Sequence, residues 1–287
     1  MLSFLKRNKF SLYVISAFLV YLIIIFPFLR GKLDFPQTIQ ISLINIRLYS
    51  FFILIGIAVA GFMVEQESAG QKDMKDLKLD EALVWMIIPG IIFARLWHVI
   101  TDFHLYQDKL IDALYVWNGG LGIFGGMVGG VLGAYLYTRK RKVNLIKGLE
   151  LTSIFFPLAH MIGRLGNFAN QELYGGATSL PWGQYINAKE SYHHPAFLYE
   201  QIGNMVLFLI LYNLYKRRGV KSDGFFILLY LFGYSIVRFA VDMIRLEPNI
   251  IWKFSTAQLT SIVLMIVIIV YYLFVFRNGK GNTAAKK

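Results

Sequence analysis

The chain has 287 residues, of which 56% are hydrophobic and 16% aromatic, and its mean hydropathy is +0.54. An ordinary soluble domain is about 45–50% apolar, so this composition excludes that class and predicts a membrane protein. A net charge of +12 would suggest a nucleic-acid partner for a soluble chain. Here the basic residues lie between apolar runs, where membrane orientation and anionic lipid explain them, so we expect no nucleic-acid partner. The absence of cysteine excludes disulfides, thiolate catalysis and cysteine-based metal sites.

Several apolar runs have the length that a membrane-spanning helix needs, about 17–25 residues. The sequence therefore predicts an all-α fold, a polytopic transmembrane helical bundle with about eight spans. The first run follows a basic segment, and no small-residue cleavage site comes after it, so we interpret it as a retained helix rather than a signal peptide. The predicted spans cover residues 10–29, 48–64, 82–100, 121–138, 147–163, 197–215, 224–244 and 255–276.

The fourth predicted span carries glycine at four-residue spacing on two ladders. Such ladders let helix backbones approach each other closely in lipid, and this packing role is sufficient for most of these glycines. The first ladder is Gly122, Gly126 and Gly130, and the second is Gly125, Gly129 and Gly133.

The distribution of Lys and Arg predicts the orientation of the chain. Loops 65–81, 138–147 and 216–223, together with both termini, carry most of these residues, and the positive-inside rule places them in the cytoplasm. Loops 101–118 and 164–196 and the far end of the seventh span then lie on the outer face. Charged side chains that are far apart in the sequence are therefore predicted to meet on one side of the membrane.

The densest group of polar residues is the stretch HMIGRLGNFANQELYG (160–175), directly after the short fifth span. Ionisable groups at a membrane edge are energetically costly, which makes them candidates for function. The alternative is a solvated loop after a buried helix. The glycines of this stretch argue against that alternative, because glycine lets the backbone turn sharply or approach a ligand.

The seventh span ends with Arg238, Asp242 and Arg245, whose i, i+4, i+7 spacing places them in one stripe of a helix. Arginine is the preferred side chain for planar, bidentate contact with phosphate, and Asp242 is placed to hold two guanidiniums for an anion. With Arg164 and Arg95, four arginines are predicted near the outer membrane boundary, where a phospholipid headgroup is the obvious anion. The alternative is a structural pairing between arginine and carboxylate that only holds helices together.

The segment HHPAFLYE (193–200) adds polar groups at the mouth of the sixth span. A metal site at His193, His194 and Glu200 is poorly supported, because adjacent histidines do not readily chelate one ion and no second motif is present. A serine hydrolase is poorly supported too, because the chain has no G-x-S-x-G motif. We therefore expect no metal and no other cofactor.

The stretch GRLGNFANQELYG resembles the signature of the prolipoprotein diacylglyceryl transferase family, G-R-x-G-N-F-x-N-x-E-x-x-G. Eight fixed positions within thirteen residues make this a specific signal. The matching residues are Gly163, Arg164, Gly166, Asn167, Phe168, Asn170, Glu172 and Gly175.

Other segments resemble the same family. RLWHVITD (95–102) is similar to its R-x-x-x-V segment, and WNGGLGIFGGMVGG (117–130) is similar to its W-x-G-G-[ML]-x-x-[HYW]-G-G stretch. HPAFLYE is similar to H-P-[ST]-[QF]-L-Y-E, with Ala196 in place of the hydroxyl residue. RFAVDMIR is similar to R-x-x-x-E-x-x-R, with Asp242 in place of Glu.

The resemblance covers residues 42–276, which we interpret as the transferase membrane domain with its outer-face loop 164–196. The usual family pattern has seven spans and an N-terminus outside. Residues 1–41 then add an extra N-terminal transmembrane helix and linker, which preserves the sidedness of all later segments. Residues 277–287 are predicted to form a basic cytoplasmic tail.

The resemblance implies a reaction in the bacterial plasma membrane, the first step of lipoprotein maturation. The sn-1,2-diacylglyceryl group of phosphatidylglycerol passes to the lipobox cysteine thiol of a preprolipoprotein signal peptide, a thioether forms and glycerol phosphate leaves. We predict Arg164 and Arg238 as catalytic groups at the phosphate, with Asn167 and Glu172 orienting them or the headgroup. The predicted substrate-binding residues are Arg164, Arg95, Asn170, Gly175, Tyr199, Glu200, Asp242 and Arg245.

The identity of the general base is open, although the thiol must lose its proton to attack efficiently. Many members of the family have a histidine in the glycine-rich motif where this chain has Phe124. Either that histidine is dispensable, or His98 or His194 replaces it, or the chain is a non-catalytic paralogue that binds lipid. His98 follows Arg95 by three residues and approaches position 124 if the glycine-rich helix packs against the third span. The alternative is a histidine capped by a backbone carbonyl.

A lipid transporter or scaffold is the alternative from another class. A transporter is expected to show internal repeats or helices broken at the bilayer midplane. The sequence shows no repeat, and its charged groups are predicted near one face, which favours the transferase.

Overall fold

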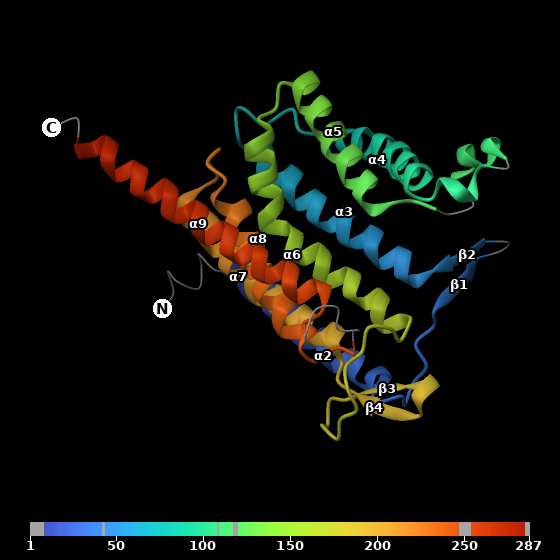
Figure 1. The fold of residues 1–287 in the computed structure, drawn as a ribbon. Coiled ribbons are helices and arrows are strands. Elements are labelled where there is room, and N and C mark those ends of the chain that lie inside the picture. The colour runs from blue at the N-terminus through green and yellow to red at the C-terminus, as the bar shows by residue number, and fades with distance from the viewer. Residues whose placement is uncertain (1–8, 42–43, 108, 117–119, 247–253, 285–287) are drawn as a thin grey trace. The chain divides into compact units, whose positions relative to one another are not determined.

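The fold is that of a computed structural model, which describes residues 9–41, 44–107, 109–116, 120–246 and 254–284 (Figure 1). Over these ranges the chain forms eight α-helices, which confirms the predicted all-α, polytopic class. The helices are α2 (Lys9–Leu29), α3 (Leu48–Ala69), α4 (Leu79–Thr101), α5 (Ile123–Arg141), α6 (Leu145–Ala169), α7 (Ala196–Arg218), α8 (Phe225–Asp242) and α9 (Thr256–Ala284).

Seven of the described helices are long and apolar enough to cross a membrane, namely α2, α3, α4, α6, α7, α8 and α9. Helix α5 corresponds to the fourth predicted span and falls outside this set. Five of its 19 residues are glycine and its last turn is basic, which lowers its mean hydropathy. A membrane crossing by α5 therefore stays a prediction. The predicted basic tail is helical as far as Ala284, and residues 285–287 lie outside the described part of the chain.

The helices form two compact units. One unit comprises residues 1–60 and 152–287, and the other comprises residues 61–151. Helices α3 and α6 each begin in one unit and continue into the other. Within the smaller unit α4 packs on α5, and within the larger unit α8 packs on both α7 and α9.

In the smaller unit α5 packs on α4 (Figure 1), and the closest backbone contacts come from one of the two glycine ladders. A Cβ atom added to Gly125, Gly129 or Gly133 would stand 2.1, 2.2 or 1.9 Å from a backbone carbonyl oxygen of α4. The other ladder is tight only at Gly122, where an added Cβ would stand 2.6 Å from the Trp97 side chain. At Gly126 an added Cβ meets nothing closer than 3.7 Å, and at Gly130 nothing within 4 Å. The glycine-rich helix thus packs against the third span, the condition under which His98 would approach position 124, and the closest backbone contacts come from the ladder of Gly125, Gly129 and Gly133.

In the larger unit, α2 packs against α6 and α7. The Tyr21 hydroxyl donates to Gln201 Oε1 at 2.8 Å, and Gln201 Nε2 donates to the carbonyl oxygen of Met161 at 2.8 Å. One buried amide therefore joins three helices. Apolar side chains of α2 also form a core cluster with the end of α6 and the start of α7. This cluster contains Ile25, Leu29, Phe168, Phe197 and Leu198.

Helix α6 continues to Ala169, six residues beyond the predicted end at Gly163, so the first half of the signature is helical. Glycine is a poor helix former, which explains why the sequence predicted an earlier end. In the structure Gly166 lies directly against the start of α3, because an added Cβ would stand 2.9 Å from Tyr49 Cα. The contact requires glycine there and holds the last turn of α6 in place.

Two short hairpins were not predicted. Strand β1 (Thr38–Ile41) pairs antiparallel with β2 (Ile44–Arg47), and β3 (Gln184–Ile186) pairs antiparallel with β4 (Ser191–His193). Strands of three or four residues carry too few side chains to show an alternating pattern. Short 3-10 helices also occur, at η1 (Phe103–Leu105), η2 (Leu110–Leu114) and η4 (Asn187–Lys189).

The glycine ladder gives a matched pair of substitutions. We expect Gly129→Ala to destabilise the protein by about 1–3 kcal/mol, because the new methyl group meets the Pro89 backbone and the helices must separate. Gly130→Ala meets open space and replaces glycine by a better helix former, so its free energy of unfolding should stay within about 1 kcal/mol of the native value. Thermal unfolding of both purified variants in detergent measures the difference. Equal stability would contradict the assignment of the packing face.

Candidate functional site

A row of five charged side chains joins α6, α7 and the end of α8 in the larger unit. Arg164 Nη2 donates to Glu200 Oε1 at 2.6 Å, and Arg238 Nη1 lies 3.8 Å from Glu200 Oε2. Asp242 Oδ1 lies 3.3 Å from Arg238 Nη2 and 3.8 Å from Arg245 Nη1. The charges therefore alternate, and each carboxylate lies between two guanidiniums. We call these five residues the charge row.

Three members of the charge row come from one helical stripe. Arg238 and Asp242 are four residues apart on α8, so their side chains lie one above the other. Arg245 follows in the turn that ends α8, where its N–H donates to the carbonyl oxygen of Val241 at 3.3 Å. The predicted pairing of Asp242 with both arginines is confirmed.

The electrostatics of the charge row depend on its burial. Glu200 is 2% exposed and the Asp242 side chain is 0% exposed. An isolated charge in such surroundings is strongly unfavourable, so each carboxylate requires its guanidiniums. With three guanidiniums and two carboxylates, the row has one positive charge in excess. Such an arrangement favours the binding of one further anion.

Two aromatic residues support the row: Tyr234, which the sequence analysis missed, and His160, which opens the polar stretch that it singled out. Tyr234, one turn before Arg238 on α8, donates its hydroxyl to Glu200 Oε1 at 3.1 Å. His160, one turn before Arg164 on α6, packs its ring on that of Tyr234 with centroids 4.7 Å apart. The spacing of four residues between Tyr234 and Arg238 is the signal that would have identified Tyr234.

The signature residues after Arg164 form a second set of hydrogen bonds. Arg164 Nη1 donates to Asn167 Oδ1 at 2.8 Å, and Asn167 Nδ2 donates to Glu172 Oε1 at 2.7 Å. Because a guanidinium only donates and a carboxylate only accepts, these partners fix the orientation of the Asn167 amide. Asn170 lies in the turn that ends α6, where its N–H donates to the carbonyl oxygen of Gly166 at 3.0 Å.

Gly175 brings the end of the signature against the end of α8. Its N–H donates to the carbonyl oxygen of His194 at 2.9 Å, and it forms an antiparallel β-bridge with Arg245. An added Cβ would stand 2.7 Å from the carbonyl oxygen of Ile244 and 2.8 Å from His194 Cβ. Any larger residue at this position would therefore push the signature away from Arg245.

His194 and Tyr199 lie together at the start of α7. His194 Nδ1 is 3.0 Å from the Tyr199 hydroxyl, which also accepts a hydrogen bond from Trp182 Nε1 at 3.1 Å. The neighbouring His193 is buried, and its Nδ1 lies 2.8 Å from the carbonyl oxygen of Gly175. The two adjacent histidines therefore have different environments, and His193 has a structural contact.

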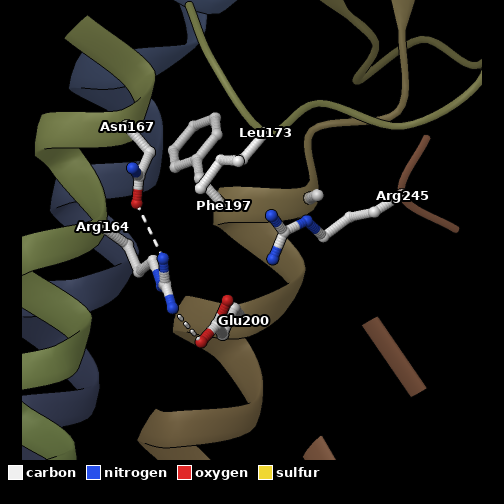
Figure 2. A pocket seen from close by; sticks show the side chains of 7 residues that line it. Arg164, Asn167, Leu173, Phe197, Glu200 and Arg245 are labelled. Carbon is white, nitrogen blue, oxygen red and sulfur yellow. Dashed lines mark hydrogen bonds and ion pairs between the residues drawn. The ribbon is translucent and has the colours of Figure 1, made fainter. Parts of the chain in front are cut away.

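A small, partly open pocket lies beside the charge row (Figure 2). Figure 2 shows Arg164 and Arg245 on two sides of the cavity, with Glu200 between them and two apolar side chains near its other end. Guanidiniums beside apolar walls suit a ligand with an anionic group and an apolar body. The lining residues are Arg164, Asn167, Leu173, Ala196, Phe197, Glu200 and Arg245.

Arg95 belongs to the smaller unit, where its guanidinium is occupied by backbone carbonyl oxygens. These hydrogen bonds tie the loop that follows α4 back to that helix. A structural role therefore accounts for the burial of Arg95, while its predicted contact with substrate stays a prediction. The accepting oxygens are those of Asp112, Ala113 and Gly120, at 2.6, 2.8 and 3.0 Å.

His98 also belongs to the smaller unit, one turn after Arg95 on α4. Its Nδ1 lies 3.0 Å from the Tyr106 hydroxyl and its Nε2 lies 3.9 Å from Asp102 Oδ2, so within the described part of the chain the ring contacts side chains. The Phe124 ring packs on Trp97 with centroids 5.9 Å apart. Over the described residues, no group of three or more His, Asp and Glu side chains is arranged to hold a metal ion.

Comparison with known proteins gives a consistent result. Residues 36–274 match the family model described as prolipoprotein diacylglyceryl transferase. Similar proteins named phosphatidylglycerol–prolipoprotein diacylglyceryl transferase occur in Fervidobacterium nodosum (33% identity, 85% of this chain and 86% of the relative) and Halalkalibacterium halodurans (36%, 85% and 86%). Another occurs in Clostridioides difficile (31% identity, 83% of this chain and 94% of the relative).

Proposed function

The chain belongs to the prolipoprotein diacylglyceryl transferase family, and we propose that it transfers the sn-1,2-diacylglyceryl group of phosphatidylglycerol to the lipobox cysteine thiol of a preprolipoprotein. The observation that carries the assignment to this site is the buried charge row with one positive charge in excess, beside a cavity with apolar walls. A phospholipid has the matching pair of an anionic phosphate and an apolar body.

The reaction exchanges one bond for another. The bond between the sn-3 carbon of the lipid and a phosphate oxygen breaks, and a bond between that carbon and the cysteine sulfur forms. The thiol loses its proton before or during the attack. The phosphodiester of the lipid carries one negative charge, and the glycerol phosphate that leaves carries two. Guanidiniums that are already in place stabilise the developing charge without reorganisation, which lowers the barrier.

The contacts support distinct roles within the charge row. Arg164 and Arg245 line the cavity and contact the phosphate, and Arg238 joins them through Glu200 and Asp242. Stabilisation of the leaving phosphate then falls to Arg164 and Arg245 directly, and Arg238, which was predicted as a catalytic group, acts through Glu200 and Asp242. Residues of the signature, together with Tyr199 at the start of α7, position Arg164 and the loops beside the pocket. These positioning residues are Asn167, Glu172, Asn170, Gly175 and Tyr199.

The activity is tested with purified protein in phosphatidylglycerol liposomes and a lipobox peptide. The native chain should form the thioether, with the same rate in the presence of EDTA. Arg164→Lys and Arg245→Lys should each lower kcat/KM by about 10²–10³, because a lysine cannot reproduce the planar contact. Arg139→Lys, on the exposed last turn of α5, is the matched control and should keep the native rate.

Each result decides a separate point. Absence of thioether with the native chain would refute the transferase activity, and lipid binding without transfer would then favour the non-catalytic paralogue. Loss of activity with EDTA would refute the metal-independent reaction. A native rate for Arg164→Lys would remove the charge row from the mechanism.

The candidates for the base that takes the thiol proton are His98 and His194, and the alternative is a reaction without a dedicated base. His194 lies in the same unit as the charge row, and His98 is held by Tyr106 in the smaller unit. Replacement of the base by Phe should lower the rate by about 10²–10⁴, measured across pH 6–8. If His98 is the base, adding Phe124→His to His98→Phe should restore part of the loss. If His98→Phe and His194→Phe both keep the native rate, neither histidine is the base.

The charge row lies toward the outer face of the bacterial plasma membrane, with both termini in the cytoplasm. The distribution of Lys and Arg supports this orientation. Because the chain has no cysteine, Lys189→Cys and Lys72→Cys introduce single labelling sites on two exposed loops. An impermeant maleimide should label the first and not the second in intact spheroplasts. Labelling of Lys72→Cys alone would reverse the orientation.

A further inference from the structure

The start of α9 carries a complete capping box. Ser255 immediately precedes Thr256, the first residue of the helix, and its Oγ accepts a hydrogen bond from the Gln258 N–H at 3.2 Å. In return, the Ser255 N–H donates to Gln258 Oε1 at 3.0 Å. The two residues satisfy each other's backbone donors, which fixes Ser255 at the N-terminus of α9.

The same serine contacts the charge row. Its hydroxyl donates to Asp242 Oδ2. Asp242, Ser255 and Gln258 are all buried, at 4%, 4% and 7% exposed. A carboxylate only accepts, so the single hydroxyl hydrogen of Ser255 points to Asp242, while an oxygen lone pair accepts from Gln258. One hydroxyl therefore caps α9 and holds a carboxylate of α8.

The two oxygens of Asp242 have different partners. Oδ2 accepts from Ser255, and Oδ1 lies 3.3 Å from Arg238 and 3.8 Å from Arg245. Close hydrogen bonds between a guanidinium and a carboxylate are about 2.7–2.9 Å long. The ion pairs of Asp242 are longer, so a phosphate competes for these arginines with a carboxylate that holds them weakly.

We propose that Ser255 is a positioning residue of the phosphate site, which holds one oxygen of Asp242 on α9 and so prevents Asp242 from binding Arg245 in a close bidentate pair. This inference rests on the proposed function of the charge row. Without the hydroxyl, the Asp242 carboxylate is able to turn both oxygens to the arginines. Arg245 would then be drawn from the cavity, and phosphate binding would weaken.

The test compares three variants of the full chain in phosphatidylglycerol liposomes. Ser255→Ala removes the donor to Asp242, and Ser255→Thr keeps it. Gln258→Ala is the matched control, because it removes half of the capping box and leaves the contact with Asp242. We expect Ser255→Ala to lower kcat/KM by about 10–100-fold, as small misplacements of a binding group do. Ser255→Thr and Gln258→Ala should stay within about threefold of the native chain.

A second readout does not need turnover. Glycerol 1-phosphate should raise the melting temperature of the native chain, and this shift should be smaller for Ser255→Ala than for Gln258→Ala. In an Asp242→Asn background, the further change Ser255→Ala should have less than about a twofold effect, since coupled residues are not additive. Equal shifts for the native chain and Ser255→Ala, or a full additive loss in the double variant, would overturn the inference.

The outcomes separate this inference from the proposed function. If the native chain transfers lipid and Ser255→Ala transfers it equally well, the inference fails and the function stands. If the native chain forms no thioether, the function fails, and the glycerol 1-phosphate shifts alone decide the role of Ser255. If Ser255→Ala does not fold, Ser255→Gly replaces it, because glycine caps helices nearly as well as serine but has no hydroxyl.

Discussion

The Glu200 carboxylate, buried between two guanidiniums, is the contact on which the rest of the site depends. Arg164 comes from α6 and Arg238 from α8, so neither arginine keeps its place without the carboxylate that α7 brings between them. The cost of leaving a buried charge without its partner makes the three helices one electrostatic unit. Tyr234 supplies a further hydrogen bond to the same oxygen as Arg164, so α6 and α8 both donate to one oxygen of Glu200.

Polar contacts between helices carry weight here because lipid removes the hydrophobic driving force for helix association. Small residues and interhelical hydrogen bonds take over that role, the latter at about 0.6 kcal/mol each on average. The chain uses both devices in different places. The contact of α4 with α5 relies on glycine, whereas the larger unit is joined by the charge row, the Gln201 amide and the Ser255 hydroxyl.

The spacing of residues along the sequence predicted which side chains share one face of a helix. It did not predict which side chains form contacts between different helices. The stripe of Arg238, Asp242 and Arg245 follows from spacing alone, and the structure confirms it. Spacing does not show which of two glycine ladders meets a neighbour, because both have the same period. The contact of Ser255 with Asp242 crosses thirteen residues and depends on where α9 returns, so the S-x-x-Q pattern predicts a cap and no more. The late end of α6 was hidden by its glycines, of which Gly166 is required by the neighbouring backbone at Tyr49.

Helix α2 lies before the residues that match the family model, yet its side chains share a core with the signature. Ile25 and Leu29 pack with Phe168, which stands next to Asn167 in the sequence. The part of the chain that identifies the family is therefore not the whole of the part that shapes the candidate site. A fragment that contains only the matched residues would keep every motif. It would lose α2, whose side chains cover one side of the core cluster beside the signature. A sequence-based boundary marks shared ancestry, whereas a folding boundary is set by which surfaces remain covered.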